Sequence, residues 1–144
     1  MTTTESNSPM SHKIAIESLL KELQVVIPDT NWIALATEES GIFYSNMPSF
    51  PSGSGLDPDR VLGVSAALMG LGQRICVQLE NGNYQYALIS GSKRKTLAIT
   101  IDDKHVLSFD LDVQVDIGEV FTAVRQTLPP LLHLLEIEKP PISK

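Results

Sequence analysis

The chain has 144 residues and a hydrophobic share of 42%, which suffices for one domain with a substantial core and excludes a wholly disordered protein. Its formal net charge of -6 argues against nucleic-acid binding, because proteins that follow a phosphate backbone concentrate Lys and Arg. One cysteine, Cys76, cannot form an internal disulfide, and no stretch approaches the roughly 18 apolar residues of a membrane span, so we expect a cytoplasmic protein without a transmembrane segment.

The first predicted element is an amphipathic helix. Residues 1–11 are polar and predict a disordered tail ahead of a domain that occupies residues 12–136. From His12 to Ile27 the apolar residues fall at helical spacing on one face. Pro28 ends this helix, because the residue before a proline avoids helical geometry.

Two short strands are predicted next. The apolar runs at residues 32–37 and 41–45 are separated by a polar turn, which is typical of a β-hairpin. Residues 46–56 are rich in proline and glycine and predict a mobile loop.

The central helix is the most informative segment. Asp57 can cap it, Pro58 suits its first turn, and its pattern continues to about Leu79. At 100° per residue it carries two large apolar stripes, with Ser65 and Gly72 between them. The first stripe contains Val61, Val64, Leu68, Leu71, Ile75 and Leu79; the second contains Leu62, Met69 and Cys76.

A third strip of this helix holds the small residues Gly63, Ala67 and Gly70. A helix that is apolar nearly all round is normally buried nearly all round, yet a helix on a small sheet should expose its outer side. Either another helix of the same chain covers it, or the helix meets its twin across a two-fold axis in an isologous dimer. Small residues would allow two such helices to approach closely.

Three strands and a last helix complete the domain. The strands contain Leu88, Ile99 and Phe109, and alternation places Tyr84, Tyr86 and Leu88 on one face of the first of them. The helix is predicted from about Ile117 to Glu136, and Pro129-Pro130 should kink or interrupt it. Residues 137–144 predict a tail. The order αββαβββα indicates a profilin-like α+β fold, a five-stranded antiparallel sheet sandwiched by helices.

Several segments resemble roadblock/dynein-light-chain domains, including MglB-type regulators. LDPDRV at residues 56–61, followed by AALMGLG at residues 66–72, is similar to the central helix of that family. ALATEESG at residues 34–41 is similar to its first hairpin, and the order of elements agrees. The resemblance covers roughly residues 13–136.

The resemblance implies a homodimer, or a heterodimer with a related roadblock chain, that forms through the central helix and the third strand. It also implies a role as a regulator or scaffold of a small Ras-like GTPase, since such domains do this and some accelerate GTP hydrolysis. On this basis we expect a dimer interface made by Leu62, Gly63, Ala66, Met69, Gly70, Gln73, Tyr84 and Tyr86.

No motif predicts chemistry within the chain. Cys76 lies on an apolar stripe and is expected to be a packed, inert thiol. His105 is expected in a solvated turn. Asp110, Asp112 and Asp116 are weak candidates for a metal site, because calcium loops need a denser oxygen supply; solvent exposure explains them better. We therefore predict no catalytic, cofactor or metal site.

Four cations are candidates for contact with a partner protein, since arginine is enriched at interfaces and a basic turn can steer an acidic partner. They are Arg60 and Arg74 on the central helix, with Lys93 and Arg94 in a later turn. The predicted function is a dimeric, non-catalytic regulator or scaffold of a small Ras-like GTPase. The alternative is a structural adaptor subunit that tethers a larger assembly without nucleotide-state dependence.

Overall fold

The structure, a computed structural model, describes residues 9–27, 29–37, 41–46 and 58–138. Its elements follow the predicted order. They are α1 (Pro9–Val26), β1 (Thr30–Thr37), β2 (Gly41–Tyr44), α2 (Pro58–Gln78), β3 (Tyr86–Ser90), β4 (Arg94–Thr100), β5 (His105–Asp112) and α3 (Ile117–Glu138).

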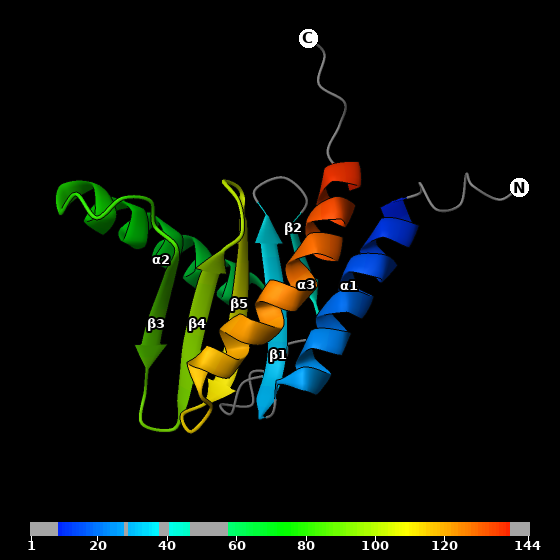
Figure 1. The fold of residues 1–144 in the computed structure, drawn as a ribbon, viewed down its shortest axis with the longest axis horizontal. Helices are drawn as coiled ribbons and strands as arrows, with labels where there is room; N and C mark the ends of the chain where they lie inside the picture. The colour runs from blue at the N-terminus through cyan, green and yellow to red at the C-terminus, as the bar shows by residue number, and fades with distance from the viewer. Residues whose placement is uncertain (1–8, 28, 38–40, 47–57, 139–144) are drawn as a thin grey trace, which may run out of the picture.

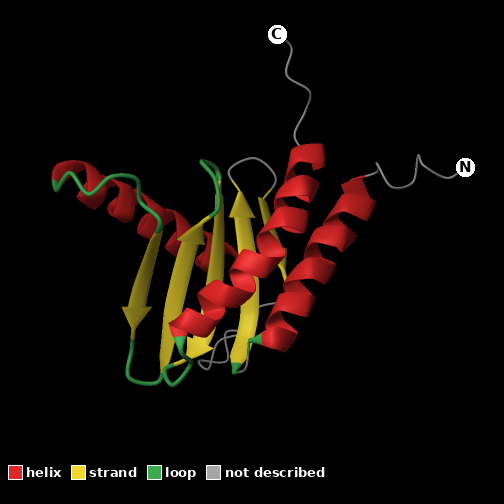
Figure 2. Ribbon diagram, in the orientation of Figure 1, coloured by secondary structure: helices red, strands yellow, loops and turns green. Residues whose placement is uncertain are grey.

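The five strands form one antiparallel sheet in the order β2-β1-β5-β4-β3. Helices α1 and α3 pack side by side on one face, and α2 crosses the opposite face (Figure 1). Figure 2 shows the resulting layers, with the two-helix layer in front of the sheet and the single helix behind it. The predicted α+β sandwich is confirmed, with β2 and β3 as its two edge strands.

The main core lies between the sheet and the α1–α3 layer. Leu20, Phe109 and Leu131 are fully buried there. The cluster on the α2 side is much smaller and consists of Trp32, Ala34, Tyr44 and Val61. Because α2 contributes only Val61 to these two buried clusters, its attachment to the described part of the chain is slight.

The ends of two helices differ from the expectation. Helix α1 begins at Pro9, so the predicted tail of residues 1–11 includes the first residues of a helix; proline suits a first turn because its missing N–H has no intrahelical partner there. At the other end α3 reaches Glu138. The predicted roles of Pro28 and Asp57, and the loop predicted for residues 46–56 after Asn46, lie outside the described residues.

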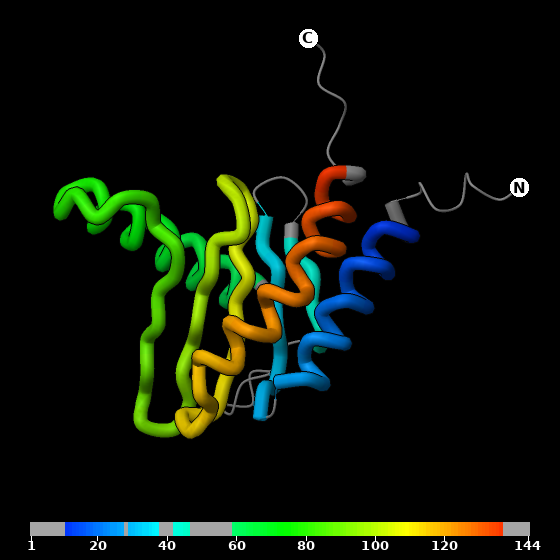
Figure 3. The backbone as a smooth tube through the Cα atoms, viewed as in Figure 1, coloured from blue at the N-terminus to red at the C-terminus, as the bar shows by residue number. Residues whose placement is uncertain are grey.

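Helix α3 runs through Pro129 and Pro130 without interruption. Both prolines are exposed, while Leu131 and Leu135 on the inner face are buried in the core. The burial of that face offsets the backbone hydrogen bonds that the prolines remove. The helix changes direction along its length (Figure 3), so the expected kink is present and the expected break is not.

The predicted shared face of Tyr84 and Tyr86 is wrong. Strand β3 begins at Tyr86, so the alternation of side chains does not extend back to Tyr84. The ring of Tyr84 lies against Gly72 of α2. The ring of Tyr86 meets Phe121 of α3 edge to face, with 4.9 Å between ring centroids. The two tyrosines therefore serve opposite faces of the sheet.

Candidate functional site

The outer surface of α2 has no cover from the described part of the chain. The helix contacts β1, β3, β4 and β5, while α1 and α3 lie on the other side of the sheet (Figure 2). Coverage by a second helix of the same chain, one of the two alternatives left by the sequence, is therefore wrong for the described residues.

The exposed apolar side chains gather around α2 and β3. Eight of the eleven large hydrophobic residues with high exposure lie on α2, on the turn that follows it, or on β3. We call these eight the α2–β3 surface; they are Val64, Leu71, Ile75, Val77, Leu79, Tyr86, Leu88 and Ile89. Tyr86 and Leu88 project from β3 toward the α3 side of the sheet, and the other six lie on the α2 side. Exposed apolar residues gathered around one helix and one strand edge typically mark an interaction site.

The apolar character of α2 exceeds what the sequence pattern suggested. Residues Asp59–Gln78 are long and apolar enough, by length and composition, to cross a membrane, which corrects the expectation that no stretch comes near that limit. Only 17% of this segment is buried, whereas the core helix of a soluble protein is mostly buried. Such a helix needs a further apolar surface to cover it.

The free edge of β3 adds unused hydrogen-bonding groups to this surface. The amide of Thr100 donates to Gln85 (3.0 Å), and the amide of Gly91 donates to the carbonyl of Arg94 (2.9 Å). Since backbone groups alternate along an antiparallel strand, the N–H and C=O groups of Tyr86, Leu88 and Ser90 point away from β4. No partner for these outward groups lies among the described residues.

The line of α2 that faces the sheet runs between the two predicted stripes. Ser65 is buried and its hydroxyl lies 2.8 Å from that of Ser108. Gly72 is packed so closely under Tyr84 that a Cβ there would collide with the ring. The large residues Leu71 and Ile75, which belong to one of the predicted apolar stripes, are consequently exposed.

Most of the predicted interface residues on α2 lie along one groove. It has a volume of about 400 Å³ and separates α2 from the β4–β5 turn. Gly63 is exposed outside it, with no atom within 4 Å of a Cβ built there. Val64, Leu71 and Ile75 were not predicted as interface residues from the sequence. The signal that could have found them is the row of small side chains at Ser65 and Gly72, which marks the side of α2 that faces the sheet. The predicted residues that line the groove are Leu62, Ala66, Met69, Gly70 and Gln73.

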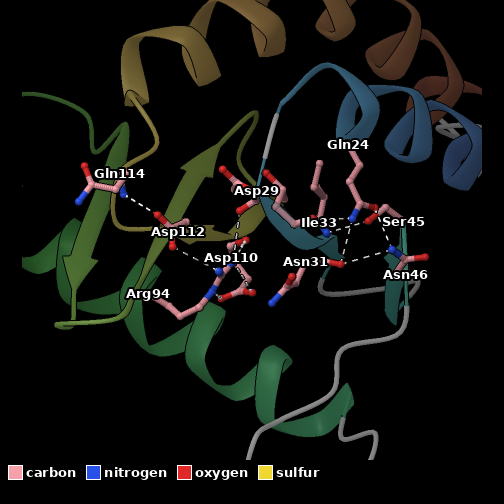
Figure 4. Close-up of polar contacts among 11 residues, drawn as sticks. Gln24, Asp29, Asn31, Ile33, Ser45, Asn46, Arg94, Asp110, Asp112 and Gln114 are labelled. Carbon is pink, nitrogen blue, oxygen red and sulfur yellow. Dashed lines mark hydrogen bonds and ion pairs between the residues drawn. The ribbon is translucent and has the colours of Figure 1, made fainter.

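Arg94, predicted to contact a partner, makes its contacts within the chain (Figure 4). Its guanidinium binds the Asp110 carboxylate through Nε (3.2 Å) and a terminal nitrogen (3.1 Å), and it donates to the carbonyl of Asp29 (3.3 Å). Asp112 lies 3.9 Å from the same group. Arg94 thereby joins β4, β5 and the α1–β1 turn, and Asp110, whose side chain is 17% exposed, is paired and not solvent-facing as expected.

The other predicted cations remain on the surface. Arg60 and Arg74 are exposed on α2, and Lys93 is exposed in the β3–β4 turn. These three side chains stay candidates for partner contact.

The candidate metal ligands serve structural roles. Asp116 accepts the amide of Gly118 at 3.0 Å and caps the start of α3. Among the residues the structure describes, no group of three or more His, Cys, Asp or Glu could hold a metal ion.

Cys76 is half-buried next to the ring of Tyr84. Burial, and to a smaller degree the neighbouring Cys76, raises the pKa of the Tyr84 hydroxyl. A phenol with a raised pKa is a poorer general base at neutral pH, so this pair favours a packing role.

His105 is buried and paired, which corrects the expected solvated turn. Its Nδ1 lies 2.7 Å from Oδ1 of Asp102. Burial alone would raise the pKa of the Asp102 carboxyl; hydrogen bonds from the Lys104 amide and from His105 outweigh it and lower that pKa. The pair fixes the β4–β5 turn that borders the groove.

Comparison with known proteins supports the fold. The sequence matches no protein-family model and no curated protein. A roadblock/LC7 domain from Streptomyces avermitilis has a TM-score of 0.69 at 14% identity and covers 83% of this chain and 97% of its own. MglB with a tetrameric arrangement gives 0.72 at 13%, covering 88% and 91%. The gliding protein MglB of Thermus thermophilus gives 0.70 at 12%, covering 88% and 92%. The chain therefore has the roadblock fold.

Proposed function

We propose that this chain is a dimeric, cytoplasmic regulator or scaffold of a small Ras-like GTPase and performs no catalysis of its own. The observation that carries the proposal is the α2–β3 surface: an apolar helix and an open strand edge, side by side, in a roadblock fold.

Dimerisation follows from the physics of this surface. Exposed apolar area is costly in water, and an unpaired edge strand invites a further strand. A second copy, or a related roadblock chain, can cover both features at once. Because a two-fold interface uses the same patch on both subunits, each copy covers the apolar helix of the other and pairs with its β3 edge.

The absence of a catalytic step rests on the contacts of the candidate groups. Cys76 is half-buried, and Asp110 and Asp116 are engaged in an ion pair and a helix cap. The proposed effect on a GTPase is therefore exerted by binding.

The test uses a purified small Ras-like GTPase from the same organism. We expect the purified full chain to bind that GTPase more tightly when it carries a non-hydrolysable GTP analogue than when it carries GDP. Hydrolysis measured with and without the chain then separates acceleration from recruitment. Equal binding in both nucleotide states supports the adaptor function instead, and no binding in either state contradicts a GTPase partner.

A further inference from the structure

We propose that the α3 side of β3 is a docking surface for an amphipathic helix of a further partner protein, which brings an acidic side chain to Arg125. This surface lies on the face of the sheet opposite α2, so the inference goes beyond the proposed function. It rests on the proposed dimer for the width of the surface alone.

The layer formed by α1 and α3 does not extend over β3. Helix α3 begins in front of β4, and no helix in the described part of the chain lies in front of β3 (Figure 2). A helix is about 10 Å wide and strands lie about 4.8 Å apart, so one helix covers about two strands. Two helices therefore cover about four strands of this sheet and leave the edge strand bare.

The exposure of side chains on β3 and β4 shows where the cover ends. Tyr86 and Leu88 project toward the α3 side and are 48% and 36% exposed. Leu97 of β4, which pairs directly with Leu88 and shares its face, is fully buried. The apolar cover of this face therefore stops between β4 and β3.

A groove of about 680 Å³ runs along this boundary, between α3 and the strands β3 and β4. We call it the α3–β3 groove. Tyr86 and Ile99 line it from the strands, and α3 lines it with side chains at helical spacing. Those side chains are Phe121, Val124 and Leu128. An apolar row of this spacing is the surface against which a second helix packs.

Arg125 gives the α3–β3 groove its charge. It is the one charged residue among the described residues that line the groove. Its side chain is exposed and makes no hydrogen bond or ion pair within the described part of the chain. Glu119 of the same helix lies about 120° away around the helix axis. A guanidinium in this position recognises a carboxylate through paired hydrogen bonds, so the docked helix carries an acidic residue beside its apolar stripe.

The proposed dimer gives this surface the width of a helix. When β3 pairs with its copy, two bare strands lie side by side, and together they are about 10 Å wide. The two copies of α3 then stand on either side of them. Because the copy uses the edge hydrogen-bonding groups of β3, the surface accepts a helix by side-chain packing and does not add a strand.

The experiment uses two synthetic amphipathic peptides of about 16 residues, a length at which helices can form. Both carry leucines at helical spacing; one has glutamates beside the leucines and the other has lysines. The net charge of the chain, -6, favours the lysine peptide through non-specific attraction, whereas Arg125 favours the glutamate peptide. We expect the full chain to bind the glutamate peptide about 10-fold more tightly, measured by fluorescence anisotropy.

Charge substitutions on α3 test the role of Arg125. Arg125→Glu should reverse the preference between the two peptides. The matched control is Gln126→Glu, which places a carboxylate at an exposed position of α3 that does not line the groove and should retain the preference for glutamate. Circular dichroism confirms that both variants fold. An unchanged preference in Arg125→Glu overturns the inference.

A photo-reactive benzophenone on the glutamate peptide locates the site. Labelling of Tyr86, Leu88 or Phe121, identified by mass spectrometry, supports the α3–β3 groove. Labelling of α2 instead, or equal binding of both peptides, overturns the docking surface and leaves the proposed dimer and GTPase partner standing. Light scattering reports the dimer separately: a monomeric mass contradicts the proposed dimer, while the dependence of peptide binding on Arg125 still decides the docking surface.

Discussion

The two edges of the sheet are treated in opposite ways. At β2 the amide of Tyr44 points away from β1, and the carboxylate of Glu17 on α1 accepts it at 3.1 Å. At β3 the outward groups of Leu88 and its alternate neighbours have no partner in the described part of the chain. Natural proteins usually protect edges from pairing. The chain itself caps an outward amide of β2, and under the proposed function β3 is the edge that joins a partner.

The strongest way to break this comparison is a proline in β3. Leu88→Pro removes an N–H that β4 does not use, so we expect a folded protomer whose dimer is weakened roughly 100-fold, through two lost hydrogen bonds and a steric clash. The matched control, Ile89→Pro, removes an N–H directed at β4 and should destabilise the fold. Sedimentation gives the dimer affinity and circular dichroism the fold.

A dimer of undiminished affinity with Leu88→Pro would show that the β3 edge is not a contact. Unfolding by Leu88→Pro and tolerance of Ile89→Pro would show that the direction assigned to the backbone groups is reversed.

Two of the three glycines of α2 sharpen the assignment of its faces. A Cβ at Gly72 meets the Tyr84 ring, and one at Gly70 meets nothing within 4 Å. Gly72→Ala should therefore cost about 1–3 kcal/mol by overpacking. Gly70→Ala should gain about 0.5–1 kcal/mol from helix propensity. Urea unfolding at one protein concentration measures both; equal effects would contradict the packing of Tyr84 on α2.

A substitution at the β2 edge is expected to have a smaller effect on stability. Glu17→Ala leaves the Tyr44 amide without its acceptor and should destabilise the fold by about 1–2 kcal/mol. Lys13, which pairs with Glu17 at 3.2 Å on the surface, serves as control; Lys13→Ala should cost less than about 0.5 kcal/mol. Thermal unfolding of both variants tests the difference. Equal losses would mean that Glu17 stabilises the fold through its ion pair with Lys13 and not through the Tyr44 amide.

The β4–β5 turn gives the smallest predicted effect. The pKa of Asp102 is lowered in the folded state, so its contribution to stability is fully present above the ordinary aspartate pKa. That contribution disappears as the pH falls through the lower folded pKa. The stability difference between the unmodified chain and Asp102→Asn should shrink over this acid range. A difference that stays constant across it would contradict the His105–Asp102 contact.

Periodicity alone predicted the order of elements, the sheet and the apolar excess of α2, because long amphipathic segments carry strong signals. The contact face of α2 was not predictable in the same way. Its sheet-facing line contains Ser65, whose partner Ser108 is 43 residues away, and Gly72, whose packing depends on Tyr84. Hydrophobicity marked the two stripes of large residues, one of which contains Leu71 and Ile75, and did not show that the line of small residues between them faces the sheet.

The polar contacts were also missed for a physical reason. Arg94 finds Asp110 across the β4–β5 register, and His105 finds Asp102 across a tight turn. Neither partner is distinguished by sequence spacing from an exposed neighbour. Only the register of the strands decides which charges meet.

The mass of the purified chain in solution, measured by light scattering across a dilution series, tests the central claim most directly. The open β3 edge and the uncovered helix predict twice the 15.7 kDa of one chain. A mass of 15.7 kDa at every concentration would contradict self-association.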